Sequence, residues 1–139
     1  PWKPFGFGLT YGEAEICNVQ SQGFSAEKTG EGKWHIAITD KAVYQEAGKN
    51  GLAVTVTCTT KYDTCVSEIL QIYVHVNGTD NEVPNIRLAA FGRMKVLPGK
   101  ETVKTFAIPA KAFMTVDSEG MRIADGDGAD IYIGFSSEK

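Results

Sequence analysis

The sequence predicts an all-β fold, an antiparallel sandwich of about seven or eight strands. Short segments with an apolar residue at every second position recur along the chain, as in strands that bury one face. Pairs of turn-forming residues separate these segments. These are Asn50-Gly51, Asn77-Gly78, Pro98-Gly99, Glu119-Gly120 and the run Asp125-Gly126-Asp127-Gly128. Short strands at this spacing favour two packed sheets with Greek-key connections.

The strand pattern is clearest in six segments. We expect strands at residues 34–39, 53–59, 68–76, 86–96, 103–108 and 131–135, and a further short strand at residues 113–116. In the second of these, Val54, Val56 and Cys58 share one face and threonines occupy the other, which predicts a half-buried strand.

The inward faces of these strands predict the hydrophobic core. Its expected members are Val54, Val56, Leu70, Ile72, Val74, Phe91, Phe106, Ile108, Ile131 and Ile133. We expect one helical segment, residues 40–48, which Asp40 caps and Gly48 ends.

Composition excludes several functional classes. The chain has 139 residues, 42% apolar and 22% charged, with a formal net charge of −3. This predicts one ordinary globular domain and favours neither nucleic-acid nor membrane partners, since no basic excess and no span-length apolar run is present. The sequence begins at Pro1-Trp2 without an initiator Met, so we expect it to be part of a longer polypeptide.

The cysteines and histidines do not form a metal-binding pattern. Cys58 and Cys65 flank a polar loop and could form a bridge across a hairpin, but we favour reduced thiols, with Cys58 buried as a small apolar residue. No Cys or His spacing typical of zinc is present. Asp125, Asp127 and Asp130 leave calcium open as an alternative to a simple turn.

Three further features of the sequence each allow two interpretations. His75 alternates with apolar neighbours and is expected on a sheet face, not as a metal ligand. Asn77-Gly78-Thr79 matches the glycosylation pattern, but we favour a turn. Trp34 is expected in the core, although it and Trp2 could stack on sugar rings.

The most distinctive part of the chain is residues 4–11. It reads Pro4-Phe5-Gly6-Phe7-Gly8-Leu9-Thr10-Tyr11. Glycine lets a backbone bend tightly and approach another surface, while exposed aromatic side chains favour packing against a partner. We therefore expect residues 2–11 to dock on a neighbouring body and not to form a strand of the sandwich.

This run is similar to a signature of family-3 glycoside hydrolases, which include β-glucosidases and β-xylosidases. There, Pro-Phe-Gly-aromatic-Gly-Leu-Ser/Thr-Tyr joins the second catalytic domain to a C-terminal fibronectin-III-like domain. Later segments also resemble that domain in order and spacing. They are Glu68-Ile69-Leu70-Gln71-Ile72-Tyr73-Val74, Leu88-Ala89-Ala90-Phe91-Gly92-Arg93-Met94, Leu97-Pro98-Gly99-Lys100, Val103 to Ile108 and Ile133-Gly134-Phe135-Ser136-Ser137.

The resemblance implies an immunoglobulin/fibronectin-III-like sandwich at residues 13–139, after an interdomain connector at residues 1–12. It implies that this domain packs against the catalytic domains of the same parent chain and stabilises them. A position bordering the substrate cleft is a further possibility that the resemblance leaves open. The resemblance also implies that the catalytic acids lie in those other domains, so we expect no catalytic residue and no cofactor here. The docking residues are then Trp2, Pro4, Phe5, Gly6, Phe7, Gly8, Leu9 and Tyr11.

Residues 59–65 lack the two glycines that the family often has before its long strand. The segment of residues 25–51, between the first and second core strands, is longer than is usual in the family. Because of these departures, the resemblance does not predict the substrate class of the parent enzyme. The alternative is a free-standing fibronectin-III or immunoglobulin-like module that binds protein or carbohydrate through its loops. The sequence does not indicate a cellular compartment.

Overall fold

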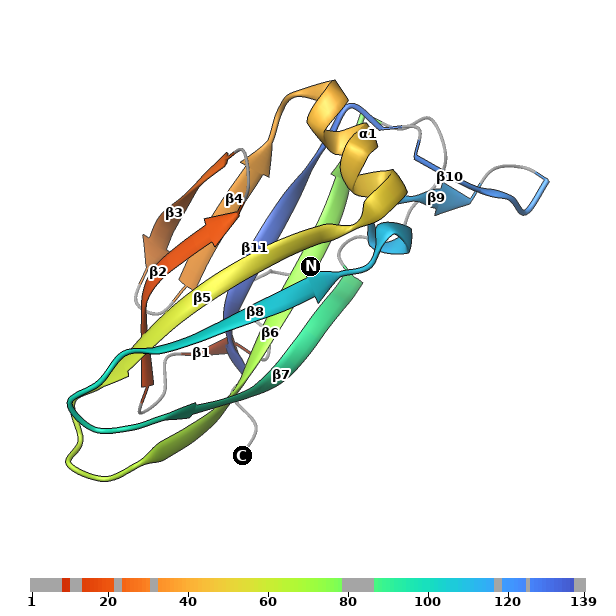
Figure 1. Cartoon of the computed structure of the whole chain (residues 1–139). Helices are drawn as coiled ribbons and strands as arrows, with labels where there is room; N and C mark the ends of the chain where they lie inside the picture. The colour runs from red at the N-terminus through yellow and green to blue at the C-terminus, as the bar shows by residue number, and fades with distance from the viewer. Residues whose placement is uncertain are drawn as a thin grey trace.

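Two antiparallel sheets pack face to face, and one helix crosses an end of the sandwich (Figure 1). This computed structural model describes residues 9–10, 14–21, 24–30, 33–78, 87–116, 119–124 and 126–136. The antiparallel β-sandwich predicted from the sequence is confirmed.

The smaller sheet has its strands in the order β2 (Ala14–Ser21), β5 (Leu52–Thr60) and β8 (Thr102–Ile108). On β5, Val54, Val56 and Cys58 point inward and are buried, while the threonines point outward, as the alternation predicts. The outer side of this sheet is therefore polar, and Thr55 and Thr105 share a hydrogen bond across it at 3.0 Å.

The larger sheet has its strands in the order β3 (Phe24–Gly30), β4 (Lys33–Ile38), β11 (Gly128–Ser136), β6 (Val66–Asn77) and β7 (Arg87–Val96). A two-residue strand, β1 (Leu9–Thr10), pairs with the end of β11. β3 also pairs with β2, through Gln20–Ser25 and Ser21–Phe24, so the two sheets are joined at this corner.

The six segments predicted most clearly correspond to β4, β5, β6, β7, β8 and β11, with ends that differ by at most three residues. β2 and β3 were not predicted. The register on β2 shifts between Ile16 and Asn18, so Cys17 is an extra, bulged residue. The buried positions are consequently Ala14, Ile16 and Val19, a spacing that breaks the two-residue period.

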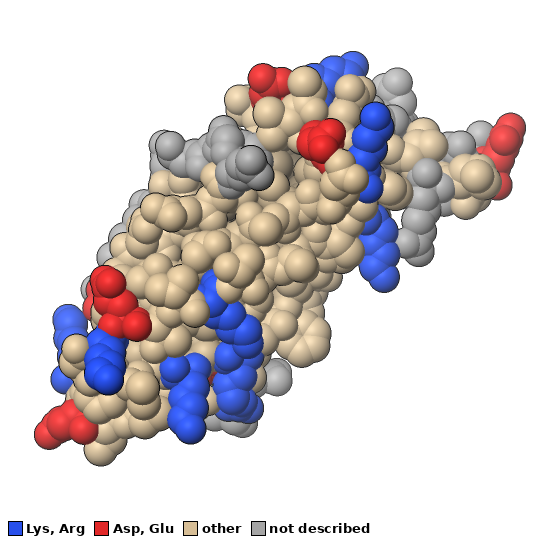
Figure 2. All heavy atoms as spheres, viewed as in Figure 1, with Lys and Arg blue, Asp and Glu red and all other residues tan. Residues whose placement is uncertain are grey.

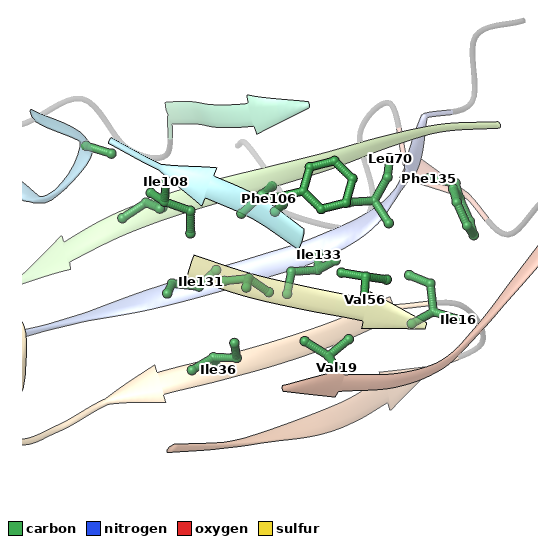
Figure 3. Close-up of a cluster of buried hydrophobic side chains, with 14 of the residues drawn as sticks. Ile16, Val19, Ile36, Val56, Leu70, Phe106, Ile108, Ile131, Ile133 and Phe135 are labelled. Carbon is green, nitrogen blue, oxygen red and sulfur yellow. The ribbon is translucent and has the colours of Figure 1, made fainter. Parts of the chain in front are cut away.

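Buried aliphatic side chains from both sheets fill the space between the layers, with the Phe106 ring near the middle of the cluster and Phe135 toward its right side (Figure 3). Nine of the ten predicted core residues are buried, and Phe91 is the exception. Trp34 is partly buried against the core and donates from Nε1 to the Ile16 carbonyl at 3.3 Å, as expected for a core side chain.

The core prediction was wrong for Phe91, whose side chain is 68% exposed on the outer face of β7. Along β7, Phe91 alternates with the buried Met94 and Val96 and shares the outer face with Arg93 and Lys95. The inward neighbour is Gly92, where an added Cβ would lie 2.9 Å from Phe106 Cε2. Phe106 therefore fills the inner space beside β7 that Phe91 was expected to fill.

The expected helix is present as α1 (Lys41–Asn50), between β4 and β5. Asp40 is the N-cap, and its Oδ1 accepts from the amide of Ala42 at 2.8 Å, as predicted. The predicted end was wrong: the helix continues past Gly48 to a C-cap at Gly51, which has φ of 79°. Gly48 is needed for packing instead, since a Cβ there would lie 2.6 Å from Ala124 Cβ.

The strand expected at residues 113–116 is only partly present. A 3₁₀ turn, η1 (Ala110–Phe113), precedes β9 (Thr115–Val116), which pairs with β10 (Arg122–Ile123). Arg87 holds this region by donating to the carbonyls of Ala112 and Met114 at 3.3 and 2.7 Å. Within the described part of the chain, no helix is long and apolar enough to cross a membrane.

Candidate interdomain docking surface

Of the predicted docking residues, only Leu9 is among those the structure describes. Trp2, Pro4, Phe5, Gly6, Phe7, Gly8 and Tyr11 lie outside the described residues. Their docking role stays a prediction, as does the boundary between a connector at residues 1–12 and a domain at residues 13–139.

One part of the connector prediction was wrong, because Leu9 and Thr10 do form a strand of the sandwich. They pair with Ser136 and Phe135 of β11. β4 pairs with β11 only as far as Ile133, so the last residues of β11 would otherwise leave backbone groups open on that edge. β1 supplies the missing partner and anchors the start of the described chain to the larger sheet.

The outer face of the larger sheet carries a row of aromatic and aliphatic side chains. Cross-strand partners place Leu88 opposite Tyr73, Tyr73 opposite Tyr132 and Tyr132 opposite His35. We call these four residues, together with Phe91, the outer aromatic patch. Facing side chains on adjacent strands lie about 5 Å apart, so the row is continuous across β7, β6, β11 and β4.

The two most exposed members of the outer aromatic patch lie on β7. The register of β6 with β7 shifts between Ile72 and Tyr73, which leaves Ala89 as an extra residue. This bulge puts both Leu88, 44% exposed, and Phe91 on the outer face, although three positions separate them. No alternation rule predicts that arrangement, and the sequence reasoning missed it.

Hydrogen bonds fix the polar end of the patch. His35 Nε2 lies 2.8 Å from Asp130 Oδ1, and the side-chain amide Nδ2 of Asn77 donates to Asp130 Oδ2 at 2.9 Å. The ring of His35 stacks on Tyr132, with centroids 5.0 Å apart and planes at 19°. His75 lies on the same face and bonds through Nδ1 to Asn77 Oδ1 at 3.0 Å, which confirms its place on a sheet surface.

The tyrosines of the patch are neutral phenols near pH 7. Burial raises the pKa of Tyr73, and burial together with the Asp130 carboxylate raises that of Tyr132. The hydroxyl of Tyr73 donates to Gln71 Oε1 at 3.1 Å, on the same face. The centre of the patch is therefore aromatic and uncharged, with polar groups at its margin.

The opposite face of the sandwich is different in character. Figure 2 shows lysine and arginine side chains at both ends of the visible face, over β7 and β8 and beside α1, with acidic side chains among them. Of the exposed basic residues near the β7–β8 connection, Arg93 and Lys95 share the outer face of β7 with Phe91, Lys100 lies between the two strands, and Lys104 Nζ donates to the Arg93 carbonyl at 3.1 Å. The outer side of the smaller sheet carries the outward threonines of β5, with Thr105 and Val103 of β8 beside them.

The aspartates considered for calcium contact other groups. Asp130 is bonded to His35 and Asn77, whereas Asp127 lies 3.7 Å from Lys41 Nζ; Asp125 lies outside the described residues. No cluster of three or more potential ligands is found among the residues that are described. Gly78 has φ of 72°, and the backbone carbonyl of Asn77 accepts from the backbone amide of Asp127 at 2.8 Å; the turn expected at Asn77-Gly78-Thr79 stays a prediction, because Thr79 lies outside the described residues.

The described cysteines are all free thiols, and Cys58 is buried while Cys17 and Cys65 are exposed. The interpretation of Cys58 as a small apolar core residue is confirmed. Burial, with a smaller contribution from Cys17, raises the pKa of Cys58 from 9.0 to about 12.

A groove of 530 Å³ lies between α1 and the β9–β10 hairpin, with Met114, Ile123 and Ala124 on one wall. Glycoside hydrolysis in most families needs two carboxyl groups across the scissile bond. Among the described residues that line the groove, the only acid is Glu46, which accepts from Asn50 on the same helix. The described lining of the groove therefore lacks the paired acids of a glycosidase site.

Comparison with known proteins agrees with the sandwich fold. The sequence model described as a fibronectin type III-like domain matches residues 68–137, half of the chain. A curated β-glucosidase of Rhizobium radiobacter is 28% identical over 138 residues, which is 99% of this chain but 14% of that protein. The chain thus spans a small part of the length of this relative.

Solved structures show the same fold. A β-glucosidase from Listeria innocua, in complex with glucose, superposes with a TM-score of 0.64 at 20% identity, over 96% of this chain and 16% of that one. A β-D-glucoside glucohydrolase from Trichoderma reesei gives 0.62 at 19% identity, over 96% and 18%. In both cases the similarity covers a minor part of a much longer enzyme chain.

Proposed function

The chain belongs to the fibronectin type III-like domain family, and from this premise we propose that it is a non-catalytic accessory domain of a β-glucosidase-like, family-3 glycoside hydrolase. In the parent polypeptide it packs against the catalytic domains, stabilises them and lies beside the substrate cleft.

The observation that carries the proposal is the small share of each relative's length that aligns with this chain. The alignment takes in 99% of this chain and only 14% of the Rhizobium radiobacter β-glucosidase. Such a ratio is expected for one domain of a multidomain enzyme. A free-standing module would instead match relatives of its own length.

The positions of three acidic residues support the proposal that this domain is not catalytic. Asp40 caps α1, and Asp130 accepts from His35 and Asn77. Glu68 is buried on the inner face of β6. The contacts of Asp40 and Asp130 are therefore structural, and Glu68 faces the core.

The test compares the 139-residue chain with the full reading frame from which it derives. We expect the full-length protein to hydrolyse an aryl β-glucoside or β-xyloside and the chain alone to give the rate of a buffer blank. Turnover by the purified chain that disappears when one Asp or Glu is changed would refute the non-catalytic role. A higher KM, with kcat unchanged, in a full-length variant altered on this domain is the expected sign of a place beside the cleft.

A further inference from the structure

The outer aromatic patch has the composition of a protein-binding surface. Its two most exposed members, Phe91 and Leu88, are 68% and 44% exposed on β7 at one end of the row, and Tyr73 and Tyr132 lie in the middle. Aromatic residues are enriched at protein interfaces, and charged groups are depleted from their centres. Here the polar groups lie at the margin, with Asp130 bonded to His35 at one end and Arg93 bonded to Ser67 at 2.9 Å at the other.

The geometry of two of the rings disfavours a sugar as the occupant. Sugar rings stack on the open faces of aromatic side chains. The rings of Tyr132 and His35 stack on each other, at 19° and a centroid distance of 5.0 Å, so each covers a face of the other. The aliphatic Leu88 at the opposite end of the row also provides no stacking face.

The position of the patch points to the same polypeptide as its partner. β1, where the described chain begins, pairs with the end of β11, and β11 carries Tyr132 in the middle of the patch. In Figure 1, β1 and the end of β11 lie at the end of the sandwich away from α1. Sequence that continues from these strands is therefore tethered to the sheet that carries the patch, and most of the length of the relatives lies outside the region they share with this chain.

We infer that the outer aromatic patch is the surface through which this domain packs against the catalytic part of its own polypeptide. The inference rests on the proposed function and specifies its interface. Phe91 and Leu88 are the anchors, because they are the large apolar members with most surface left to bury. The outer face of the smaller sheet, which carries the threonines of β5 and Val103 of β8, stays exposed to solvent.

Thiol labelling tests the inference without relying on enzyme activity. The background is Cys17→Ser with Cys65→Ser, which removes the two exposed thiols and leaves the buried Cys58. Phe91→Cys places a probe on the patch. Val103→Cys is the matched control, because Val103 is an apolar residue with similar exposure, 59%, on the outward side of β8. Both variants are labelled with a maleimide in the 139-residue chain and in the full-length protein.

We expect the thiol of Phe91→Cys to react at least about tenfold more slowly in the full-length protein than in the chain alone, and that of Val103→Cys to change by less than about twofold. Equal rates for Phe91→Cys in the two proteins overturn the inference. Slowing in the chain alone on addition of laminarin or cellopentaose overturns it in favour of a glycan site. Slowing as the concentration of the chain alone rises overturns it in favour of a second copy.

Activity of the same full-length samples separates this inference from the proposed function. A full-length protein that hydrolyses β-glucosides but labels freely at Phe91→Cys refutes the interface alone. One that protects Phe91→Cys yet hydrolyses neither β-glucosides nor β-xylosides supports the patch as an intramolecular interface and refutes the glycoside hydrolase assignment.

Discussion

The buried hydroxyl of Tyr44 donates to the carbonyl oxygen of Phe113 at 2.5 Å. The same oxygen of Tyr44 accepts from the amide of Gly126 at 3.1 Å. One side chain on α1 therefore satisfies backbone groups in η1 and just before β11, and both would be costly to leave unbonded away from water. This contact fixes the helix to the end of the sandwich.

We expect Tyr44→Phe to lower the free energy of unfolding by about 1–3 kcal/mol, because the ring remains while two buried backbone groups lose their partner. Urea unfolding followed by fluorescence measures the change. Tyr62→Phe is the control. Tyr62 is 52% exposed in the β5–β6 loop, so loss of its hydroxyl is expected to lower the free energy of unfolding by less than about 0.5 kcal/mol. Equal effects of the two variants would contradict the role assigned to Tyr44.

Phe106 and Phe91 give a second matched pair. Phe106 is 5% exposed at the centre of the core, so Phe106→Ala is expected to cost about 3–5 kcal/mol in the chain alone. Phe91→Ala removes the same atoms from an exposed site and should cost less than about 0.5 kcal/mol there. Denaturant midpoints of the two variants, measured side by side, decide whether Phe91 belongs to the core.

These two phenylalanines also show what the sequence could predict. Regular alternation predicted β5 and β6 and their buried residues, because each inward position is filled by its own apolar side chain. β7 violates this rule at Gly92, where the space is filled by Phe106 from the other sheet. A local pattern contains no information about such a contact between distant segments, so the largest apolar residue of β7 was assigned to the wrong face.

Bulges account for the other omissions. Cys17 shifts the period of β2, and Ala89 brings Leu88 and Phe91 to one side of β7. The outer aromatic patch therefore depends on an irregularity that no two-residue period predicts. The alternation of His75 with apolar residues did predict the outer face of β6 correctly, since β6 follows its period through most of its length.

Gly51 and Gly99 test how the helix ends. Both have positive φ, 79° and 71°, so an alanine at either is expected to cost about 1–2 kcal/mol in backbone strain. A Cβ at Gly51 would also lie 2.6 Å from the carbonyl oxygen of Ile108, whereas one at Gly99 meets no atom within 4 Å. We expect Gly51→Ala to destabilise by about 1–3 kcal/mol more than Gly99→Ala, as measured by urea unfolding. Equal losses would mean that α1 can shift away from β8 without penalty.

The Cys58 thiol predicts how stability changes at alkaline pH. Its pKa in the folded chain is about 12, above the ordinary value of 9.0, so the folded state holds the proton more tightly. The contribution of this group to stability is complete below pH 9 and is lost as the pH rises from about 9 towards 12. We expect Cys58→Ala to show a shallower loss of stability over this range than the parent sequence. At pH 8, a thiol reagent should label Cys17 and Cys65 and react with Cys58 only after unfolding.

Gly6 and Gly8 test the docking role predicted for the run before β1. Valine at either position opposes positive φ and close approach of the backbone to another surface. In the chain alone, we expect Gly6→Val and Gly8→Val to leave the melting temperature nearly unchanged, because the pairing of Leu9 and Thr10 with β11 lies beyond both positions. In the full-length protein, the same changes should lower the melting temperature or the activity, since burying each large aromatic side chain of the run is worth about 1.5–3 kcal/mol. Unfolding of the chain alone on either change would place these glycines in the core of this domain and refute the docking role.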